Sequence, residues 1–263
     1  MKEFQHHTVV VTGGASGIGA ACCRRFAAEG ARVAVVDQDT EGARRTAAEV
    51  GGWSGQADVS SRAQLESVAA AIEREVGQPT VLIACAGIVQ DPLPPDQLPQ
   101  DTFDRVLDVN LRGTYLACAV FGAAMARRHR GAIVAVASVA GMRSMPLYAY
   151  SPAKAGIISL VEGLAGEWGR AGVRVNAISP GYTVTPALEE QIRLGYRDPD
   201  TLRRQSALGE LIRPEHIADA VLFLSSMRAA MITGINLPVD AGWLVSGSWQ
   251  TFGGVRGSQR EAE

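Results

Sequence analysis

The sequence predicts an α/β fold built on a doubly wound parallel sheet. Short runs of β-branched and other apolar residues alternate with longer amphipathic segments, which is typical of repeated strand–helix–strand units. The first of these runs is followed directly by a cluster of glycines, a common connection between such a strand and its helix. With 263 residues and 47% hydrophobic content, the chain can bury one large core, so we expect a single domain.

Seven of the apolar runs are expected to form strands. They lie near residues 8–12, 32–36, 54–57, 80–84, 131–137, 173–178 and 234–238. Helices are expected between them, and one shows the 3.6-residue period of a packed face, at Leu65, Val68, Ala69, Ile72 and Val76. We assign residues 1–245 to the domain and residues 246–263 to a C-terminal tail.

A glycine-rich turn, Thr12 to Gly19, joins the first strand to the first helix. Gly13 permits the turn, Gly17 lets the backbone approach a pyrophosphate, and Gly19 lets the helix pack close to the strand. Free amide groups and the positive end of the helix then face the phosphates. The turn therefore predicts a Rossmann-like dinucleotide site.

An acidic residue ends the second strand and indicates which dinucleotide is bound. The carboxylate of Asp37 can accept hydrogen bonds from both hydroxyls of a ribose and would repel a 2′-phosphate. Gln38 follows it, and the glycine turn contains no Arg or Lys that could neutralise such a phosphate. These residues favour NAD(H) over NADP(H).

Tyr150 and Lys154 lie four residues apart in a predicted helix, so the phenol and the ammonium share one face. A cation beside a phenol favours the phenolate, which predicts a lowered pKa for Tyr150 and a role as general acid/base near neutral pH. The alternative is an ordinary surface pair, because the same spacing arises by chance in many helices.

Together these motifs resemble those of the short-chain dehydrogenase/reductase family, from about residue 8 to about residue 245. Further matches follow in the family's order: Asp58-Val59, Cys85-Ala86-Gly87, Asn110, Ser138, and Pro180-Gly181 with Thr183 and Thr185 after it. The resemblance implies a cofactor site made of Gly13, Ser16, Gly17, Ile18, Gly19, Asp37, Asp58, Val59, Cys85, Ala86, Gly87, Tyr150, Lys154, Pro180, Gly181, Thr183 and Thr185.

The resemblance also implies four catalytic residues, Asn110, Ser138, Tyr150 and Lys154. Ser138 would hold the substrate oxygen and Tyr150 would exchange a proton with it, while the nicotinamide carries the hydride. Lys154 would lower the phenol pKa and contact the nicotinamide ribose, and Asn110 would hold a water that links Lys154 to solvent. The expected enzyme is an NAD-dependent dehydrogenase or reductase of a small secondary alcohol or ketone.

Two residues depart from the family's pattern. Cys85 stands where the family usually has asparagine, so a polar contact that steadies the central sheet is absent or replaced; we still expect activity. Pro152 lies between Tyr150 and Lys154, and proline is tolerated in the first turn of a helix, so we expect the helix to begin close to Tyr150. Tyr148 has no lysine four residues on and is expected to line the substrate pocket.

The segment 182–213 is expected to cover the substrate as a mobile lid. Its arginines, which include Arg193, Arg197, Arg203 and Arg204, suit a hydroxy acid, polyol or sugar acid, although charges on such a segment can also form a solvated face. Few aromatic residues lie in this segment, which disfavours a steroid-sized substrate.

The composition of the chain limits which binding partners and which cellular compartment we expect. A net charge of −2 and a pI of about 6.1 give no basic surface for nucleic acid or an anionic membrane. The four cysteines, Cys22, Cys23, Cys85 and Cys118, lack metal-ligand spacing, so no metal is expected. The N-terminus lacks the apolar core of a signal peptide, and no apolar run is long enough to cross a membrane, so we expect a cytoplasmic protein.

The C-terminal segment carries apolar residues that would be exposed on a monomer: Trp243, Leu244, Val245, Trp249 and Phe252. We expect it to pack on a neighbouring subunit or near its active site, in a homotetramer or dimer of the kind common in the family, with a floppy end over 253–263. The alternative function is a catalytically silent NAD(H)-binding sensor or scaffold, against which the four catalytic positions argue. An epimerase or dehydratase would need a longer C-terminal domain.

Overall fold

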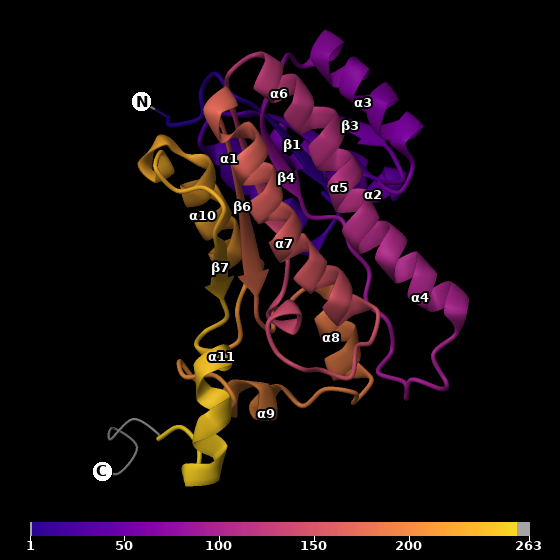
Figure 1. Ribbon diagram of the computed structural model, residues 1–263, viewed down its shortest axis with the longest axis vertical. Coiled ribbons are helices and arrows are strands. Elements are labelled where there is room, and N and C mark those ends of the chain that lie inside the picture. Colours follow the sequence, from indigo (N-terminus) through magenta and orange to yellow (C-terminus); the bar gives the residue numbers. More distant parts are fainter. Residues whose placement is uncertain (1, 257–263) are drawn as a thin grey trace.

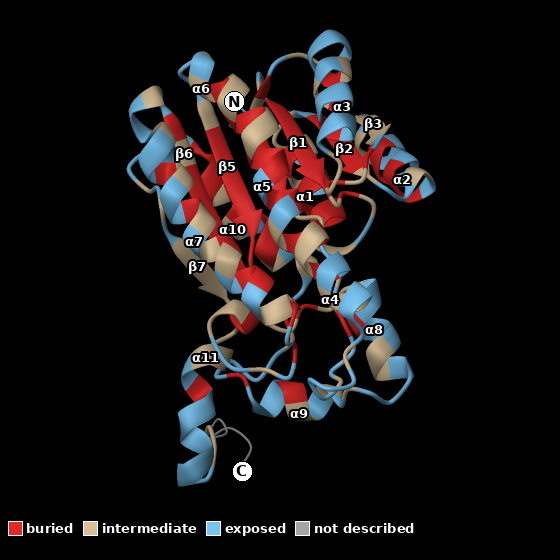
Figure 2. Cartoon of the chain, turned by 45° about the vertical axis from the view of Figure 1, so that its right-hand side comes forward, coloured by how far each residue is buried: buried red, intermediate tan, exposed pale blue. Residues whose placement is uncertain are grey.

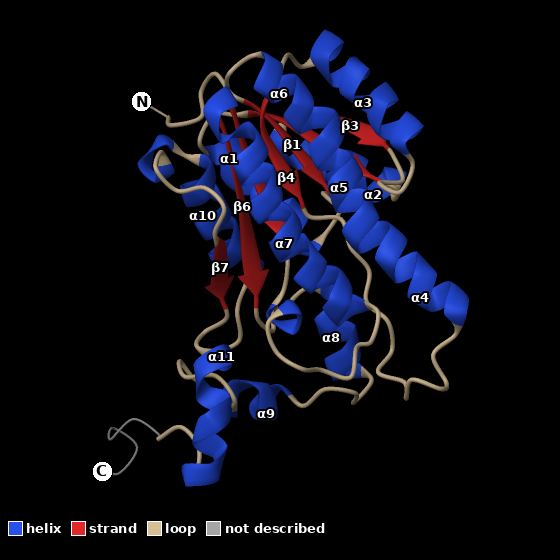
Figure 3. Ribbon diagram, viewed as in Figure 1, coloured by secondary structure: helices blue, strands red, loops and turns tan. Residues whose placement is uncertain are grey.

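The computed structural model describes residues 2–256 and contains one sheet of seven parallel strands (Figure 3). The strand order is β3-β2-β1-β4-β5-β6-β7, and every neighbouring pair runs in the same direction. The strands are β1 (Thr8–Thr12), β2 (Arg32–Asp37), β3 (Trp53–Gln56), β4 (Pro79–Ala84), β5 (Gly131–Val136), β6 (Val173–Pro180) and β7 (Asn236–Val239). The doubly wound parallel fold predicted from the sequence is confirmed.

All seven predicted strands are present, with small shifts at their ends. The last strand begins at Asn236 and not at 234, because Gly234 takes a left-handed conformation with φ +78°. The third strand begins one residue earlier than predicted, where Trp53 pairs with Ala34 of β2. These differences concern only the ends of the strands.

Helices cover both faces of the sheet (Figure 1). The α-helices are α1 (Gly17–Ala28), α2 (Thr40–Val50), α3 (Arg62–Glu75), α4 (Gln100–Leu107), α5 (Gly113–Ala117), α6 (Ala123–Arg127), α7 (Tyr150–Trp168), α8 (Pro186–Arg193), α9 (Pro199–Arg204), α10 (Pro214–Ser225) and α11 (Trp243–Ser246). Short 3-10 segments are η3 (Val139–Gly141), η4 (Gly169–Ala171), η5 (Met227–Ala229) and η6 (Gly247–Phe252).

The core forms two apolar layers, one on each face of the sheet, whose central strands are coloured as buried in Figure 2. Successive side chains of a strand point to opposite faces, so Val10 packs under α3, α5 and α7 while Val9 and Val11 pack under α1 and α10. Each fully buried valine contributes roughly 1.5–3 kcal/mol of transfer free energy. Burial on both faces explains why the strands are continuous apolar runs without alternating polar residues.

One long helical segment, residues 100–127, contains two π-helical turns, η1 (Asp108–Arg112) and η2 (Cys118–Gly122). In η1 the backbone N–H of Gly113 donates to the carbonyl of Asp108, five residues earlier. Such a bulge releases carbonyl groups from the usual i to i−4 pattern and is frequent at functional sites. Neither turn was predicted from the sequence.

The carboxyl ends of the strands face the part of the chain that contains α8, α9 and α11 (Figure 1). The strand order reverses between β1 and β4, and ligands of doubly wound sheets bind in the crevice at this point. The expected tail is seen as the end of α11 and η6, and its last residues, 257–263, lie outside the described part of the chain. No helix among the described residues has both the length and the apolarity needed to cross a membrane.

Candidate active site

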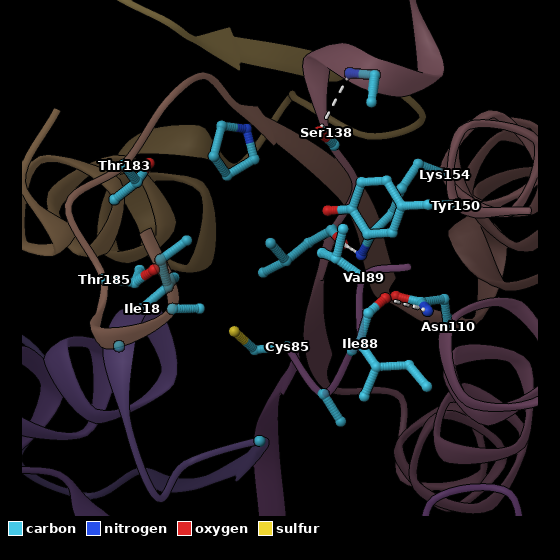
Figure 4. A pocket seen from close by; sticks show the side chains of 18 of the residues that line it. Ile18, Cys85, Ile88, Val89, Asn110, Ser138, Tyr150, Lys154, Thr183 and Thr185 are labelled. Carbon is cyan, nitrogen blue, oxygen red and sulfur yellow. Dashed lines mark hydrogen bonds between the residues drawn. The ribbon is translucent and has the colours of Figure 1, made fainter. Parts of the chain in front are cut away.

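A cavity of about 540 Å³ opens at the carboxyl edge of the sheet. Its walls come from the glycine turn after β1, the ends of β2, β4, β5 and β6, the start of α7, and the segment that holds α8. All the predicted catalytic and cofactor residues contribute to these walls. Figure 4 shows Ser138, Tyr150 and Lys154 on one side of this cavity, opposite Ile18, Thr183 and Thr185.

The glycine turn has the geometry that a dinucleotide requires. Gly13 and Gly17 take left-handed conformations with φ +70° and +52°, and a Cβ on Gly13 would lie 2.6 Å from the Cα of Ala86. A Cβ on Gly19 would lie 2.0 Å from the carbonyl oxygen of Gly13. Since Ser16 precedes the first turn of α1, the unpaired N–H groups of that turn face the cavity edge, where phosphates would fit.

Asp37 is held against this turn by backbone donors. Its Oδ2 accepts a hydrogen bond from the N–H of Ala15 at 3.0 Å, and its Oδ1 accepts one from the N–H of Asp39 at 3.0 Å. Each carboxylate oxygen keeps a lone pair for a ribose hydroxyl. Gln38, which is uncharged, lines the cavity beside it.

Asp58 is placed on the same side but its carboxylate is already engaged. Oδ1 accepts hydrogen bonds from the backbone and side chain of Ser60, and Oδ2 pairs with Arg105 at 3.0 Å. These bonds fix the turn after β3, so that Asp58 and Val59 form part of the cavity wall.

Cys85 begins the turn after β4, and its sulfur points into the cavity (Figure 4). Its N–H donates to the carbonyl and the hydroxyl oxygen of Thr12, which ties the ends of β1 and β4 together through the backbone. Burial raises the pKa of the Cys85 thiol to about 11, so the thiol stays protonated near neutral pH. The junction is therefore held without the asparagine that relatives of this kind were expected to use.

Tyr150 is the first residue of α7, and Pro152 lies within its first turn, as predicted. Lys154 is only 3% exposed, and its Nζ donates to the carbonyl of Val136 at 2.7 Å. The same Nζ lies 5.4 Å from the centre of the Tyr150 ring. The phenol and the amine therefore share a face of α7, as their spacing predicted.

The expected lowering of the Tyr150 pKa is wrong for the protein as described. Burial raises this pKa to about 12, although the neighbouring Ser138 hydroxyl acts in the opposite direction. Burial also lowers the pKa of Lys154 to about 8. Both shifts have one cause, because a low-dielectric environment disfavours the charged form of either group. The spacing of the two residues predicted that the Lys154 cation lies nearby, but it could not predict the burial that raises the Tyr150 pKa.

Ser138 follows β5 and caps the short η3 segment. Its hydroxyl oxygen accepts a hydrogen bond from the N–H of Ala140 at 3.1 Å, which leaves the O–H free to point toward the cavity. The extended backbone of Ser138 places the side chain on the same wall as Tyr150.

Asn110 lies in the π-helical turn η1 and is fully buried. Its Nδ2 donates to the carbonyls of Ile88 at 2.8 Å and Val106 at 2.9 Å. Its Oδ1 accepts no hydrogen bond from the described residues, and a Cβ on Gly87 would lie 2.6 Å from it and 3.5 Å from the Nζ of Lys154. The open acceptor and the amine thus border the same small space beside Gly87, which suits a bridging water.

The segment after Pro180-Gly181 closes the cavity opposite α7. Thr185 caps α8, because its hydroxyl accepts the N–H of Leu188, and its methyl group lies near the place that a Cβ of Gly17 would occupy. Thr183 lies beside it in Figure 4. This arrangement brings the expected lid against the glycine turn.

Several cavity residues were not predicted. An apolar wall comes from the loops after β4 and before α7 and from the lid, and it includes Val89, Met145, Leu147, Tyr182 and Leu188. Gln90 and Gln191 add polar groups, next to Arg197, which the sequence analysis had named among the lid arginines suited to the substrate. Tyr148 was expected here but is 42% exposed and is not part of the cavity wall. Loop residues carry no periodic signal, so only the three-dimensional arrangement identifies them.

Among the described residues, no three His, Cys, Asp or Glu side chains are grouped so that they could hold a metal ion. The cysteines are free, and burial raises the pKa of each thiol. The polar groups of the site are instead a hydroxyl, a phenol, an amine and an amide.

Comparison with known proteins finds relatives along almost the whole chain. A family model described as Enoyl-(Acyl carrier protein) reductase matches residues 13–244. D-threitol dehydrogenase of Mycolicibacterium smegmatis is 38% identical over 242 residues, which cover 90% of this chain and 92% of that protein. 2-(S)-hydroxypropyl-CoM dehydrogenase 3 of Xanthobacter autotrophicus is 36% identical over 250 residues, 92% of this chain and 98% of that protein.

A solved structure from Brucella melitensis, described as a ribose-5-phosphate isomerase, is 52% identical to this chain with a TM-score of 0.95. It covers 97% of this chain, which in turn covers 99% of it.

Proposed function

This chain belongs to the short-chain dehydrogenase/reductase family, and we propose that it transfers a hydride between NAD(H) and a small secondary alcohol or ketone. One observation carries the proposal: a single cavity contains the glycine turn with Asp37 and also the set Ser138, Tyr150, Lys154 and Asn110. A dinucleotide bound at the first part would reach the proton-handling groups of the second.

The bound nicotinamide would supply or accept the hydride. Ser138 orients the substrate oxygen, and Tyr150 exchanges a proton with it. Because burial raises the pKa of Tyr150, the phenol is protonated at neutral pH and ready to donate. Lys154 and the open acceptor of Asn110 form the inner end of the proton path.

NAD(H) is the proposed cofactor. The Asp37 carboxylate is fixed by two backbone N–H groups, so it cannot turn away from a 2′-phosphate without breaking both hydrogen bonds. The carboxylate and a 2′-phosphate carry like charges and would repel each other. We expect turnover with NAD to exceed turnover with NADP by at least ~10²-fold in kcat/KM.

The proposed substrate is a polyol, hydroxy acid or sugar acid. D-threitol dehydrogenase, by name, acts on a four-carbon polyol, and its similarity to this chain supports the polyol. Polar groups of Gln191 and Arg197 beside an apolar wall suit a small molecule with several oxygens. We also propose that the enzyme is cytoplasmic and homo-oligomeric, on the basis of its composition and exposed C-terminal residues.

The description of the Brucella structure suggests a second reaction, the isomerisation of a sugar phosphate, which needs no nicotinamide. The glycine turn and Asp37 favour the redox reaction, because an isomerase has no use for a dinucleotide cradle. A silent NAD(H) sensor would have the cradle but no use for Ser138 and Tyr150.

One experiment separates these functions. Purified protein is given NAD or NADP with D-threitol, other small diols, hydroxy acids and sugar acids, and reduced nicotinamide is followed by absorbance. Ribose 5-phosphate without nicotinamide tests the isomerase. NAD-dependent turnover of a panel member supports the proposal; isomerisation alone, or tight NADH binding with no turnover, contradicts it.

Tyr150→Phe is expected to bind NADH as the wild type does and to lose ~10²–10⁴-fold in kcat, because no proton donor remains at the substrate oxygen. NADH fluorescence measures binding and absorbance measures turnover. Tyr148→Phe is the matched control, since Tyr148 lies two residues earlier, outside the cavity wall, and should keep full activity. Wild-type turnover by Tyr150→Phe would remove Tyr150 from its proposed role.

A further inference from the structure

The N-terminus of α7, which carries Tyr150, has no capping side chain of its own. The N-cap position is Ala149, which cannot accept a hydrogen bond from the first N–H groups of the helix. The N–H of Ser151 donates to the carbonyl of Leu147, and Pro152 has no N–H. The N–H groups of Ala149 and Tyr150 therefore need an acceptor from elsewhere in the chain.

Gln90 supplies that acceptor from the loop after β4. Its Oε1 lies 2.9 Å from the N–H of Ala149 and 2.9 Å from the N–H of Tyr150, and accepts a hydrogen bond from both. Because both partners are donors, the amide orientation is fixed: Oε1 must face the helix and Nε2 must face away. Gln90 is 5% exposed, so water does not replace these bonds.

The same loop also accepts a hydrogen bond from Asn110, another of the predicted catalytic residues. Asn110 donates from Nδ2 to the carbonyl of Ile88, two residues before Gln90. The loop thus links the buried amide of Asn110 to the helix end that carries Tyr150. Two predicted catalytic residues from different helices are held in one arrangement by this strap of residues 88–90.

We propose that Gln90 is the positioning residue for Tyr150: it replaces the missing helix cap and fixes the phenol relative to Ser138 and Asn110. This inference rests on the proposed function, because it assigns Gln90 a part in the proton transfer by Tyr150. Gln90 is not itself a catalytic residue, since its two hydrogen bonds go to backbone N–H groups of α7 and not to the reacting atoms.

The decisive comparison uses two variants of similar size. Gln90→Met keeps the length of the side chain but removes the acceptor, while Gln90→Glu keeps an acceptor oxygen in the same position. Gln97→Met is the control, because Gln97 is exposed in the same connection between β4 and α4. Circular dichroism and thermal melting establish that all three variants fold.

The first readout needs no substrate. In the apoprotein, hydrogen exchange of a peptide spanning 147–153 reports the N–H groups of Ala149 and Tyr150. We expect about 10-fold or faster exchange of these amides in Gln90→Met and wild-type exchange in Gln90→Glu and Gln97→Met. Unchanged exchange in Gln90→Met overturns the assignment whatever the activity.

The second readout is turnover of the alcohol that the panel identifies. We expect kcat of Gln90→Met to fall on the order of 10- to 100-fold, because small displacements of a catalytic group have effects of that size, with KM little changed. In oxidation of the alcohol Tyr150 accepts the proton, and loss of the Ser138 contact should raise its pKa, so the acidic limb of the pH–rate profile should also move to higher pH. Gln90→Glu should recover most of the kcat.

The two proposals fail separately. Faster exchange in Gln90→Met with unchanged kcat and pH profile would overturn the positioning role while Tyr150→Phe remains inactive, which leaves the proposed function intact. A panel without turnover would contradict the proposed function, and the exchange readout would still decide whether Gln90 holds α7.

Discussion

At the scale of single residues, burial controls the chemistry of the site more than charge does. Tyr150 and Lys154 lie close enough for a cation to stabilise a phenolate, yet the pKa of Tyr150 rises to about 12 and that of Lys154 falls to about 8. Both shifts favour neutral groups. The pair therefore holds a phenolic proton to donate beside an amine that releases its own proton easily, which suits reduction of a carbonyl.

Burial of the Lys154 amine lowers the free energy of unfolding, and a variant without the amine can reveal this effect. In the unfolded chain Lys154 has its ordinary pKa of 10.5, so from pH 8 to 10.5 the unfolded state binds more protons and rising pH stabilises the fold. Below pH 8 that stabilisation is absent. We expect Lys154→Met to unfold at higher urea at pH 7, with about 1–3 kcal/mol more free energy of unfolding, after the loss of the Val136 hydrogen bond.

The advantage of Lys154→Met over the wild type should shrink as the pH rises from 8 to 10.5, because the wild-type amine is then neutral in the folded state. Urea titrations at pH 7 and pH 10 measure it. Lys2→Met is the control, since Lys2 is exposed and its substitution should have little effect at either pH. A Lys154→Met protein that is less stable than wild type at pH 7 would contradict the role of burial.

At the scale of elements, the sequence was sufficient to predict the strands and the start of α7. Apolar runs identified all seven strands, because parallel strands buried on both faces leave an unbroken apolar signature. Pro152 correctly located the start of α7. The π-helical turn that carries Asn110 could not be predicted, because its residues have ordinary helical composition and only tertiary contacts select the bulge.

The same limit applies to contacts between elements. The cap that Gln90 provides to α7 joins residues 59 and 60 positions apart, and no local pattern marks such a pair. The predicted direction of the Tyr150 pKa shift was wrong for a related reason, since spacing along one helix indicates which residues are close but not how deeply they are buried. The motifs identified residues that the structure brings together around one cavity, whereas the loops that orient them could be found only in the structure.

The lid offers a test of substrate class. Three of its arginines pair with carboxylates of the lid itself: Arg193 with Glu190, Arg203 with Asp200 and Arg204 with Asp198. Arg197 lines the cavity and forms no ion pair with the described residues. A cation left in this position can bind a substrate carboxylate.

We expect Arg197→Met to lose ~10- to 100-fold in kcat/KM for a substrate that carries a carboxylate, which corresponds to one charge-assisted hydrogen bond, and to change little for a neutral polyol. Initial rates with a matched hydroxy acid and diol measure the difference. Arg193→Met, which removes only a surface ion pair, is the control. Equal losses on both substrates would show that Arg197 acts on the lid and not on the carboxylate.

At the scale of the whole molecule, the C-terminal segment extends away from the sheet beyond the lid (Figure 1). The start of this segment is well packed. The rings of Trp243 and Tyr182 meet edge to face with their centres 5.9 Å apart, and the Ser246 hydroxyl donates to the carbonyl of Gln205. Farther along, Trp249 is 48% and Phe252 is 88% exposed. A segment anchored to the lid with aromatic side chains facing outward suits a contact with a second subunit.

We therefore predict that the protein associates through this segment and that Trp249→Ser with Phe252→Ser weakens the association. In a two-fold interface each substitution counts twice, and at roughly 1.5–3 kcal/mol for each buried aromatic the dissociation constant should rise by at least ~10⁴-fold. Sedimentation equilibrium over a range of concentrations measures this. Met231→Ser, which changes a 97% exposed residue on η5's connection to β7, should sediment as the wild type does. Because α11 contacts Tyr182 and Gln205 of the lid, the dissociated variant should also show a higher KM for the alcohol, with kcat little changed. If the double variant sediments with the same mass as the wild-type oligomer, the subunit contact lies elsewhere.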